Sequence, residues 1–388
     1  MEATKILFFK QTAWHCFMEL GIDLAKVVGP CVMYTSVQEN GQIGNLRVLK
    51  SPPYRRDSDL RRLWSWFCYF FIAVKIAWKE PTSALLFIVA QPPYLPLIGY
   101  LRHILSGQKY VVWVDDIFPD ALVRHGRLSE HHILVKLWKW LNRLMYGRAS
   151  CVLTLGPRMA EVLSQYVRGG RDKIVIVPTW VDPKVIRPLR KEENPFAIQQ
   201  GQVNKLTVLY SGNLGLSYNL DTMVQAAVRL RHRSDIHFMV IGAGSRWGEI
   251  ESASKELANF SLLPYQPDEI LPYSLATGDI GVVSLESKFN GISMPSKTYY
   301  AMAAGSALLC MTEKGSDLEM VVEQHQCGVT VQPGNVDNFV EAVLRFADDK
   351  NYLNRCRNNA RIAAEYVFSR HVNVSRVSEI VNSISKRI

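Results

Sequence analysis

A glycine turn after an apolar run holds the residues best suited to bind a phosphate. The run LTVLYSG leads into Gly212, Asn213 and Gly215, and Gly242 ends a second run of this kind, HFMVIG. Glycine lets backbone N–H groups approach a phosphate closely, and the start of a following helix favours its negative charge. Each turn is also compatible with a tight strand-to-helix connection that binds nothing.

The segment Met-Pro-Ser-Lys places a lysine at the start of a predicted helix. Ser296 is of a type that caps helix N-termini, and Lys297 follows it in the first turn. A cation there opposes the helix dipole, so its position is better explained if an anion occupies the helix end. The alternative is a solvated surface lysine.

Three carboxylates follow another apolar run, YVVWV. They are Asp115, Asp116 and Asp120 in the sequence DDIFPD. A carboxylate at the carboxyl end of a strand that faces a cleft can orient or deprotonate a hydroxyl group. The alternative is that Asp116 or Asp120 caps the helix that begins near Pro119, and we favour this role for Asp120.

The overall composition excludes several other kinds of protein. The chain has 388 residues, 48% of them apolar and 21% charged, which excludes a disordered chain and a collagen-like repeat. Its seven cysteines are scattered, and no two have the C-x-x-C spacing of a zinc site or redox pair. We therefore expect no metal site, and a reduced, cytoplasmic interior fits this cysteine usage.

Apolar runs typical of buried strands alternate with helical periods along the whole chain. The expected strands lie at 5–9, 31–36, 84–90, 110–114, 151–155, 173–178, 206–212, 237–244, 260–265, 280–285, 307–311 and 328–334. The expected helices lie at 12–27, 58–79, 131–147, 157–168, 219–233, 247–258, 296–304, 317–325, 336–347 and 351–388, the last broken near Phe368–Ser369. Continuous apolar strands separated by helices indicate parallel sheets covered on both faces.

The length predicts two domains of ordinary size. Residues 181–205 are polar, contain prolines and lack either apolar period, as expected of a linker. We therefore predict two doubly wound α/β domains that face a cleft, at 1–185 and 186–365, with a final helix at 366–388 returning toward the first domain. In sheets of this kind, ligands bind beyond the carboxyl ends of the strands.

The positive charge is concentrated in the first half of the chain. Residues 1–190 hold 26 Lys and Arg against 14 Asp and Glu, a net charge of +12, whereas residues 191–388 hold 19 against 21, a net of −2. This asymmetry predicts a polyanionic partner for the first half only, either an anionic membrane surface or a nucleic acid. No nucleic-acid recognition motif accompanies the charge, so we favour the membrane.

One segment has the make-up of a helix that lies on an anionic membrane. Residues 133–148 combine an apolar stripe with four Lys and Arg, although such a stripe also suits a helix packed against a core. Further basic and aromatic residues in the same half are Arg55, Arg56, Arg61, Arg62 and Trp64. The most apolar stretch, 63–78, carries Lys75 and is shorter than the roughly 20 residues that span a bilayer, so we expect no transmembrane helix.

Several motifs occur in a fixed order along the chain. They are DDIFPD (115–120), IVPTWVDP (176–183), YSGNLG (210–215), VIGAG (240–244), ATGDIGVVSLES (276–287), MPSKTYYAMAAG (294–305) and CGVTVQPGN (327–335). In this order they resemble the retaining glycosyltransferases of family GT4, and most closely the bacterial exopolysaccharide and O-antigen transferases typified by colanic-acid synthesis enzymes. The resemblance is strong from about residue 110 to 345 and weak before 110.

The resemblance implies a GT-B fold, with two Rossmann-like domains that bind the acceptor and a nucleotide-sugar respectively. It implies metal-independent transfer with retention at the anomeric carbon, and a UDP- or GDP-linked donor with no further cofactor. By motif, the donor diphosphate would meet Gly212, Asn213, Gly215, Gly242, Ser296 and Lys297, and Tyr265 and Gln266 would lie near the base. Asp116 matches the acidic position of a D-x-x-P-[DE] motif near the acceptor or donor sugar.

The chain departs from the common GT4 pattern at four positions. That pattern has an arginine after the first glycine and a lysine five residues later, where this chain has Asn213 and Tyr218. The E-x7-E pair is also missing, because Ile292 and Tyr300 stand where the glutamates would fall.

Because the chain lacks these four residues of the common pattern, we expect other residues to take their catalytic roles. Lys297 is then expected to supply more of the charge opposite the leaving group, with help from helix dipoles. Glu286 and Glu319 are the candidate replacements for the missing glutamates, and Asp116 is the candidate catalytic carboxylate.

We therefore expect a glycosyltransferase that moves a hexosyl or N-acetylhexosaminyl group to a polyprenyl-diphosphate-linked or other saccharide in cell-surface polysaccharide synthesis. Such an acceptor implies a cytoplasmic protein attached peripherally to the inner face of the plasma membrane. The alternatives are a non-catalytic GT-B partner subunit that binds nucleotide-sugar and an enzyme like the UDP-N-acetylglucosamine 2-epimerases.

Overall fold

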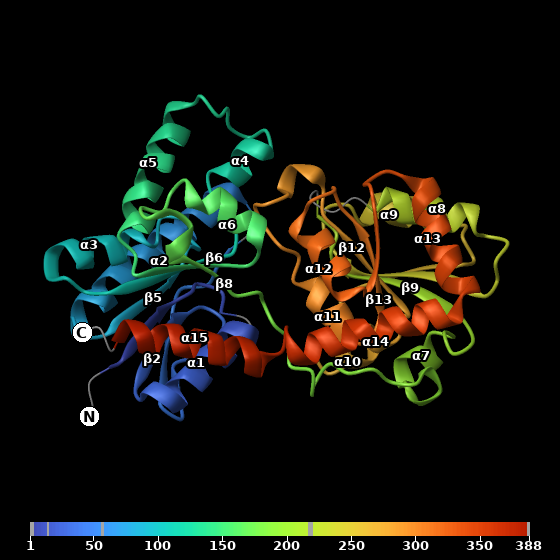
Figure 1. The fold of residues 1–388 in the computed structure, drawn as a ribbon, viewed down its shortest axis with the longest axis horizontal. Helices are drawn as coiled ribbons and strands as arrows, with labels where there is room; N and C mark the ends of the chain where they lie inside the picture. The colour runs from blue at the N-terminus through green and yellow to red at the C-terminus, as the bar shows by residue number, and fades with distance from the viewer. Residues whose placement is uncertain (1–3, 14, 56–57, 216–219, 386–388) are drawn as a thin grey trace. The chain divides into compact units, whose positions relative to one another are not determined.

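The computed structural model describes residues 4–13, 15–55, 58–215 and 220–385 (Figure 1). The contacts within the chain divide it into two compact units. Unit 1 comprises Met1–Pro178, Gly291–Ser293 and His371–Ile388, and unit 2 comprises Thr179–Asn290 and Met294–Arg370. Arg56 and Tyr218, which the sequence singles out, lie outside the described residues.

Unit 1 is built on an eight-stranded sheet in the order β3-β4-β2-β1-β5-β6-β7-β8. Its strands are β1 (Ile6–Phe9), β2 (Cys31–Thr35), β3 (Gly41–Ile43), β4 (Leu46–Lys50), β5 (Leu85–Val89), β6 (Tyr110–Val114), β7 (Cys151–Thr154) and β8 (Ile174–Ile176). Its helices are α1 (His15–Val28), α2 (Asp59–Lys79), α3 (Leu97–Ser106), α4 (Asp120–Arg124), α5 (Ile133–Gly147), α6 (Pro157–Ser164) and α15 (Arg370–Ser385). Of its strand pairs, β3–β4 is antiparallel and the others are parallel.

The helices of unit 1 cover both faces of the sheet. In Figure 1, α2, α3, α5 and α6 lie on one face, and α1 and α15 lie on the other. The strands are buried along their length: all five residues of β5 and all five of β6 are buried, which explains why they read as continuous apolar runs. The Lys109 ammonium donates to the carbonyl oxygen of Ile384 at 3.0 Å, so α15 is joined to this unit.

Unit 2 is built on a six-stranded parallel sheet in the order β11-β10-β9-β12-β13-β14. Its strands are β9 (Leu206–Asn213), β10 (Ile236–Ala243), β11 (Phe260–Leu263), β12 (Ile280–Ser284), β13 (Ala307–Met311) and β14 (Gly328–Val331). Its helices are α7 (Pro195–Gln199), α8 (Asp221–Arg229), α9 (Trp247–Ser254), α10 (Leu271–Ala276), α11 (Lys297–Ala303), α12 (Asp317–His325), α13 (Val336–Asp348) and α14 (Lys350–Tyr366). In Figure 1, α8, α9 and α13 lie on one face of this sheet, and α10, α11 and α14 lie on the other.

Both sheets have the doubly wound arrangement that the alternating pattern predicts. The chain runs outward from β9 to β11, then returns across the sheet to β12 and continues to β14. The strand order therefore reverses between β9 and β12, and a crevice forms beyond the carboxyl ends of strands at such a point.

The structure contains elements that the sequence pattern did not reveal. Strands β3 and β4 form an edge hairpin of mixed polarity, and α3, α7 and α10 are short helices of at most ten residues. The expected break in the last helix is present, because α14 ends at Tyr366 and α15 begins at Arg370. Among the described helices, none is both long enough and apolar enough to cross a membrane.

Candidate functional site

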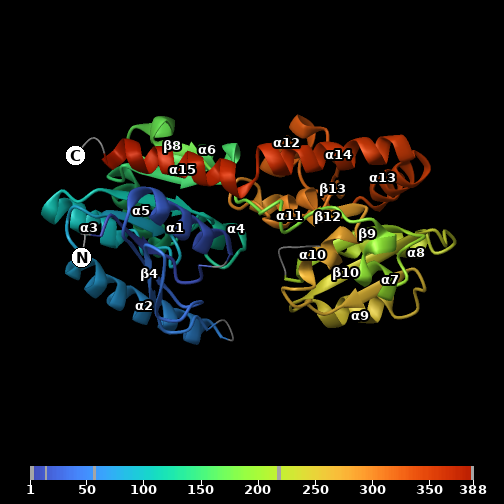
Figure 2. The same ribbon diagram turned by 90° about the horizontal axis from the view of Figure 1, so that it is seen from below.

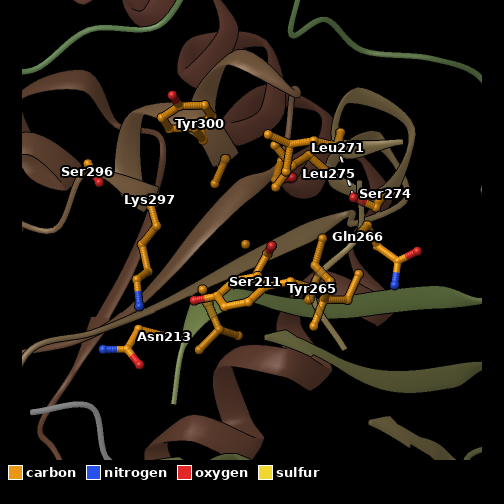
Figure 3. Close-up of a pocket in the computed structure, with 17 residues that line it drawn as sticks. Ser211, Asn213, Tyr265, Gln266, Leu271, Ser274, Leu275, Ser296, Lys297 and Tyr300 are labelled. Atoms are coloured by element: carbon orange, nitrogen blue, oxygen red, sulfur yellow. Dashed lines mark hydrogen bonds between the residues drawn. The ribbon is translucent and has the colours of Figure 1, made fainter. Parts of the chain in front are cut away.

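A pocket of about 330 Å³ lies at the reversal point of the unit 2 sheet. The last residues of β9, part of β10 and β12, the first turn of α11 and helix α10 surround it (Figure 3). It is lined by Leu209, Ser211, Gly212, Asn213, Ile241, Tyr265, Gln266, Leu271, Ser274, Leu275, Gly281, Val282, Ser296, Lys297, Tyr300, Ala301 and Ser306. Lys297 supplies the positive charge among these residues, and none of them carries a carboxylate.

The pocket brings together about half of the site residues expected from the sequence. Those that line it are Gly212, Asn213, Tyr265, Gln266, Ser296 and Lys297. Those that do not are Gly215, Gly242, Glu286, Glu319 and Asp116.

Lys297 is held against the end of β9. Its ammonium donates to the Tyr210 hydroxyl at 2.5 Å and lies 4.1 Å from the centre of the Tyr210 ring. The Tyr210 hydroxyl donates in turn to the carbonyl oxygen of Asn213 at 2.7 Å. Burial lowers the pKa of Lys297 to about 7, because an ammonium removed from water loses hydration.

Two glycines create the space for this arrangement. A Cβ on Gly212, whose φ is +152°, would lie 3.1 Å from the Lys297 Nζ atom, so a side chain there would crowd the ammonium. A Cβ on Gly242 would lie 1.9 Å from the carbonyl oxygen of Gly212. Gly242 therefore allows β10 to pack closely against the turn after β9. The backbone of Gly242 is not part of the pocket lining.

Ser296 occupies the N-cap position of α11 but does not cap it through its side chain. Its backbone is in the right-handed helical region, with φ of −61°, and its hydroxyl makes no capping bond. A capping serine has extended backbone, which lets its oxygen reach the N–H groups of the first turn. The expectation of a side-chain cap is therefore wrong, and Ser296 instead lies exposed at the pocket, beside Lys297 (Figure 3).

The opposite side of the pocket is largely apolar. Tyr265 is 53% exposed, and Leu271 and Leu275 from α10 also line the pocket. The Gln266 side-chain amide donates to the carbonyl oxygen of Pro264 at 2.8 Å. An apolar wall beside a cation suits a ligand with one flat, weakly polar end and one anionic end.

The two candidate replacement glutamates have other partners. Glu286 forms an ion pair with Lys288 at 2.8 Å. Glu319 belongs to the start of α12, where its carboxylate accepts from the N–H of Gly315 at 2.5 Å and its own N–H donates to the Ser316 hydroxyl at 3.1 Å. This pattern is close to a capping box, a structural device of helix N-termini.

Asp116 lies in unit 1, in the loop after β6, and its side chain is exposed. Its neighbour Asp115 pairs with Lys10 at 2.5 Å, beyond the end of β1. The expected capping role of Asp120 is wrong, because Pro119 is the N-cap of α4 and the Asp120 carboxylate accepts from the Tyr166 hydroxyl at 2.6 Å.

Sequence reasoning missed several residues of the pocket. Ser274 and Leu275 belong to α10, whose six residues are too few to show a helical period. Tyr300 also lines the pocket, although the sequence analysis named it only because it stands where the GT4 pattern has a glutamate. Tyr210 does not line the pocket but contacts Lys297, and the sequence could have pointed to it, because a tyrosine buried in an apolar strand needs a partner for its hydroxyl.

Comparisons with known proteins agree with this architecture. Residues 205–349 match the family described as Glycosyl transferases group 1, a region that contains the whole pocket. The chain is 25% identical over 288 residues to glycosyltransferase WbjE of Pseudomonas aeruginosa, covering 73% of this chain and 70% of the relative. It is 29% identical over 328 residues to WcaI of Escherichia coli K12, named for colanic acid biosynthesis, covering 80% of this chain and 78% of the relative.

A solved structure agrees on the fold of the whole chain. Anabaena HepE, crystallised with UDP-glucose, superposes with a TM-score of 0.72 at 16% identity, covering 98% of this chain and 99% of HepE. The two doubly wound units are those of the GT-B fold, and the fold expected from the sequence is confirmed. The chain is a glycosyltransferase whose residues 205–349 match the group 1 family, and it is similar to bacterial glycosyltransferases, one of them named for colanic acid biosynthesis.

Proposed function

We propose that the unit 2 pocket binds a nucleotide-sugar, UDP-linked in preference to GDP-linked, through its diphosphate. The observation that carries this proposal is the Lys297 ammonium beside the Gly212 turn, in a pocket where the described lining residues include no carboxylate. A diphosphate meets a positive charge there and no repulsion. The structural relative HepE was crystallised with UDP-glucose, which supports the choice of uridine.

The proposed reaction is sugar transfer with retention and without metal. The bond between the anomeric carbon and the diphosphate oxygen breaks, and a bond to the acceptor hydroxyl forms. The acceptor's proton passes to the departing phosphate oxygen. Lys297 stabilises the negative charge that develops on this leaving group, which is the largest electrostatic change in the reaction. Asp116 is proposed to orient the acceptor hydroxyl or the transferred sugar.

Calorimetric titration of the whole chain tests the donor site. UDP, GDP, ADP, CMP and their common sugar conjugates are titrated without added metal. We expect UDP and at least one UDP-sugar to bind, with an affinity that Lys297→Met lowers by about tenfold or more. No binding by any of these nucleotides would overturn the proposal. Binding without any sugar transfer would favour the non-catalytic partner subunit.

We further propose that unit 1 attaches to an anionic membrane surface, where a lipid-linked saccharide acceptor is found. Support comes from three helices on one face of its sheet, α2, α3 and α5, with α3 packed against the other two. Together these helices carry eight Lys and Arg, of which Arg102 on α3 is buried, and a single acidic residue, Asp59. This composition is complementary to anionic headgroups.

The outward side of α2 supplies the apolar part of this surface. Ser65, Tyr69, Ala73 and Ala77 form its buried stripe. The opposite stripe consists of large exposed side chains: Leu60, Leu63, Trp64, Phe67, Phe71 and Trp78. Figure 2 shows α2 at the periphery of unit 1. On α5 the exposed apolar residues are Ile133, Leu134, Leu137 and Trp140, whereas Met145 of the expected stripe is buried.

Co-sedimentation with vesicles tests the attachment. The vesicles contain phosphatidylcholine alone or equal parts of phosphatidylcholine and phosphatidylglycerol. We expect binding to the anionic vesicles, lost in Phe71→Glu and retained in Ile362→Glu, a control on unit 2 with the same 54% exposure. Equal binding to both vesicle types, or equal loss in both variants, would contradict the proposal.

A further inference from the structure

Tyr210 is in direct contact with Lys297, the cation of the pocket. It is completely buried, with 0% of its surface exposed, near the end of β9. Its hydroxyl accepts from the Lys297 ammonium at 2.5 Å and donates to the carbonyl oxygen of Asn213 at 2.7 Å. One hydroxyl group therefore connects the charge of the pocket to the backbone of the turn.

This connection fixes where the ammonium stands before any ligand arrives. A lysine side chain has many rotamers, and ordering one upon binding reduces affinity. The Tyr210 hydroxyl holds the end of the chain, and the Tyr210 ring lies under it with 4.1 Å between Nζ and the ring centre. Gly212 keeps open the space that the ammonium fills.

The same hydroxyl also supports the turn. Asn213 is the last residue of β9, and its carbonyl oxygen is the acceptor of the Tyr210 hydroxyl. The residues that follow form the glycine turn expected to present N–H groups to a phosphate. Tyr210 thus sets the position of the cation relative to this backbone.

We infer that Tyr210 is a positioning residue for diphosphate binding: its hydroxyl holds the Lys297 ammonium at a fixed place beside the Gly212–Asn213 turn. The inference rests on the proposed donor site and adds to it the residue that prepares the cation. The hydroxyl acts on the diphosphate end of the ligand, and the nucleoside end lies toward Tyr265 and the apolar wall.

The substitution Tyr210→Phe tests this role. Phenylalanine keeps the buried ring and its contact with the ammonium, and it removes both hydrogen bonds. We expect calorimetric titration to show UDP affinity reduced by about tenfold and uridine affinity unchanged. In the Lys297→Met background, Tyr210→Phe is expected to lower UDP affinity less than it does in the wild type, because no ammonium remains to be held and only the hydrogen bond to the turn is lost.

The matched control is Tyr110→Phe. Tyr110 is also completely buried, and its hydroxyl donates to the carbonyl oxygen of Met145 at 2.5 Å in unit 1. We expect this variant to bind UDP like the wild type, although it loses a buried hydrogen bond of the same kind. Incorporation of a fluorinated tyrosine at position 210, which weakens the hydroxyl as an acceptor but keeps it in place, gives a second test should Tyr210→Phe not fold.

The outcomes separate the inference from the proposed function. UDP binding by Tyr210→Phe equal to that of the wild type would overturn the inference alone. An equal loss of UDP and uridine affinity would also overturn it, because that result indicates a general distortion of the pocket. Failure of the wild-type protein to bind UDP or any other nucleoside diphosphate would overturn the proposed function itself.

Discussion

Lys297 determines how nucleotide binding should depend on pH. Burial lowers its pKa to about 7, so the free protein carries an ammonium below this pH and a neutral amine above it. A diphosphate binds the charged form, and binding in turn raises the pKa of the amine. Affinity should therefore be full at low pH and fall as the pH rises above 7.

Titration with UDP-glucose from about pH 6 to about pH 9 measures this effect, because its diphosphate does not titrate in that range. We expect affinity to fall by up to about tenfold per pH unit above the pKa of the free amine. Lys297→Met should bind weakly at every pH, with no trend. A wild-type affinity that stays constant across the range would show that the Lys297 charge takes no part in binding.

The sequence identified Lys297 more securely than it identified its surroundings. A lysine in the first turn of a helix is unfavourable without an anion, so type and position alone pointed to a ligand. The capping role expected for Ser296 failed because its backbone is helical, and backbone angles cannot be read from residue type. Glu319 was expected as a replacement for a missing glutamate, yet the spacing Ser316-x-x-Glu319 is that of a capping box and explains its position.

At the scale of the elements, β10 packs closely against the turn after β9, and this packing fixes the position of the turn residues that line the pocket. A Cβ on Gly242 would meet the Gly212 carbonyl oxygen at 1.9 Å, and both groups belong to paired strands that cannot easily separate. Gly242→Ala should therefore destabilise the protein by about 1–3 kcal/mol and weaken nucleotide binding by displacing the turn.

Urea denaturation measures the stability change, with Gly248→Ala as the control. Gly248 lies on α9 with open space around its Cβ position, so alanine there should be neutral or stabilise the helix by up to about 1 kcal/mol. If Gly242→Ala is as stable as the wild type, the two strands are not packed as described.

The strand and helix pattern was predictable where the elements are long or fully buried. Strands such as β6 and β12 are buried on both faces, so they read as unbroken apolar runs. The hairpin of β3 and β4 was not predictable in this way, because at the sheet edge buried Leu46 and Val48 alternate with exposed Arg47. Helices α7 and α10 have five and six residues, too few for a period to appear.

For the molecule as a whole, the two units differ in the surfaces that they expose. Unit 2 has a pocket at the reversal point of its sheet, and Lys297 is the cation in its lining. Unit 1 holds an exposed, basic and aromatic face on α2, α3 and α5. The uneven charge along the sequence is therefore consistent with one unit that meets a membrane and one that binds a nucleotide-sugar.

The measurement that tests the central claim most directly is amide hydrogen exchange of the whole protein with and without UDP. We predict slower exchange in the peptides that contain the end of β9, residues 265–266 and the first turn of α11, because these segments surround the proposed diphosphate and base positions. Protection at these three places would locate the nucleotide in the unit 2 pocket. Unchanged exchange at all three, under conditions where UDP is bound, would contradict the account.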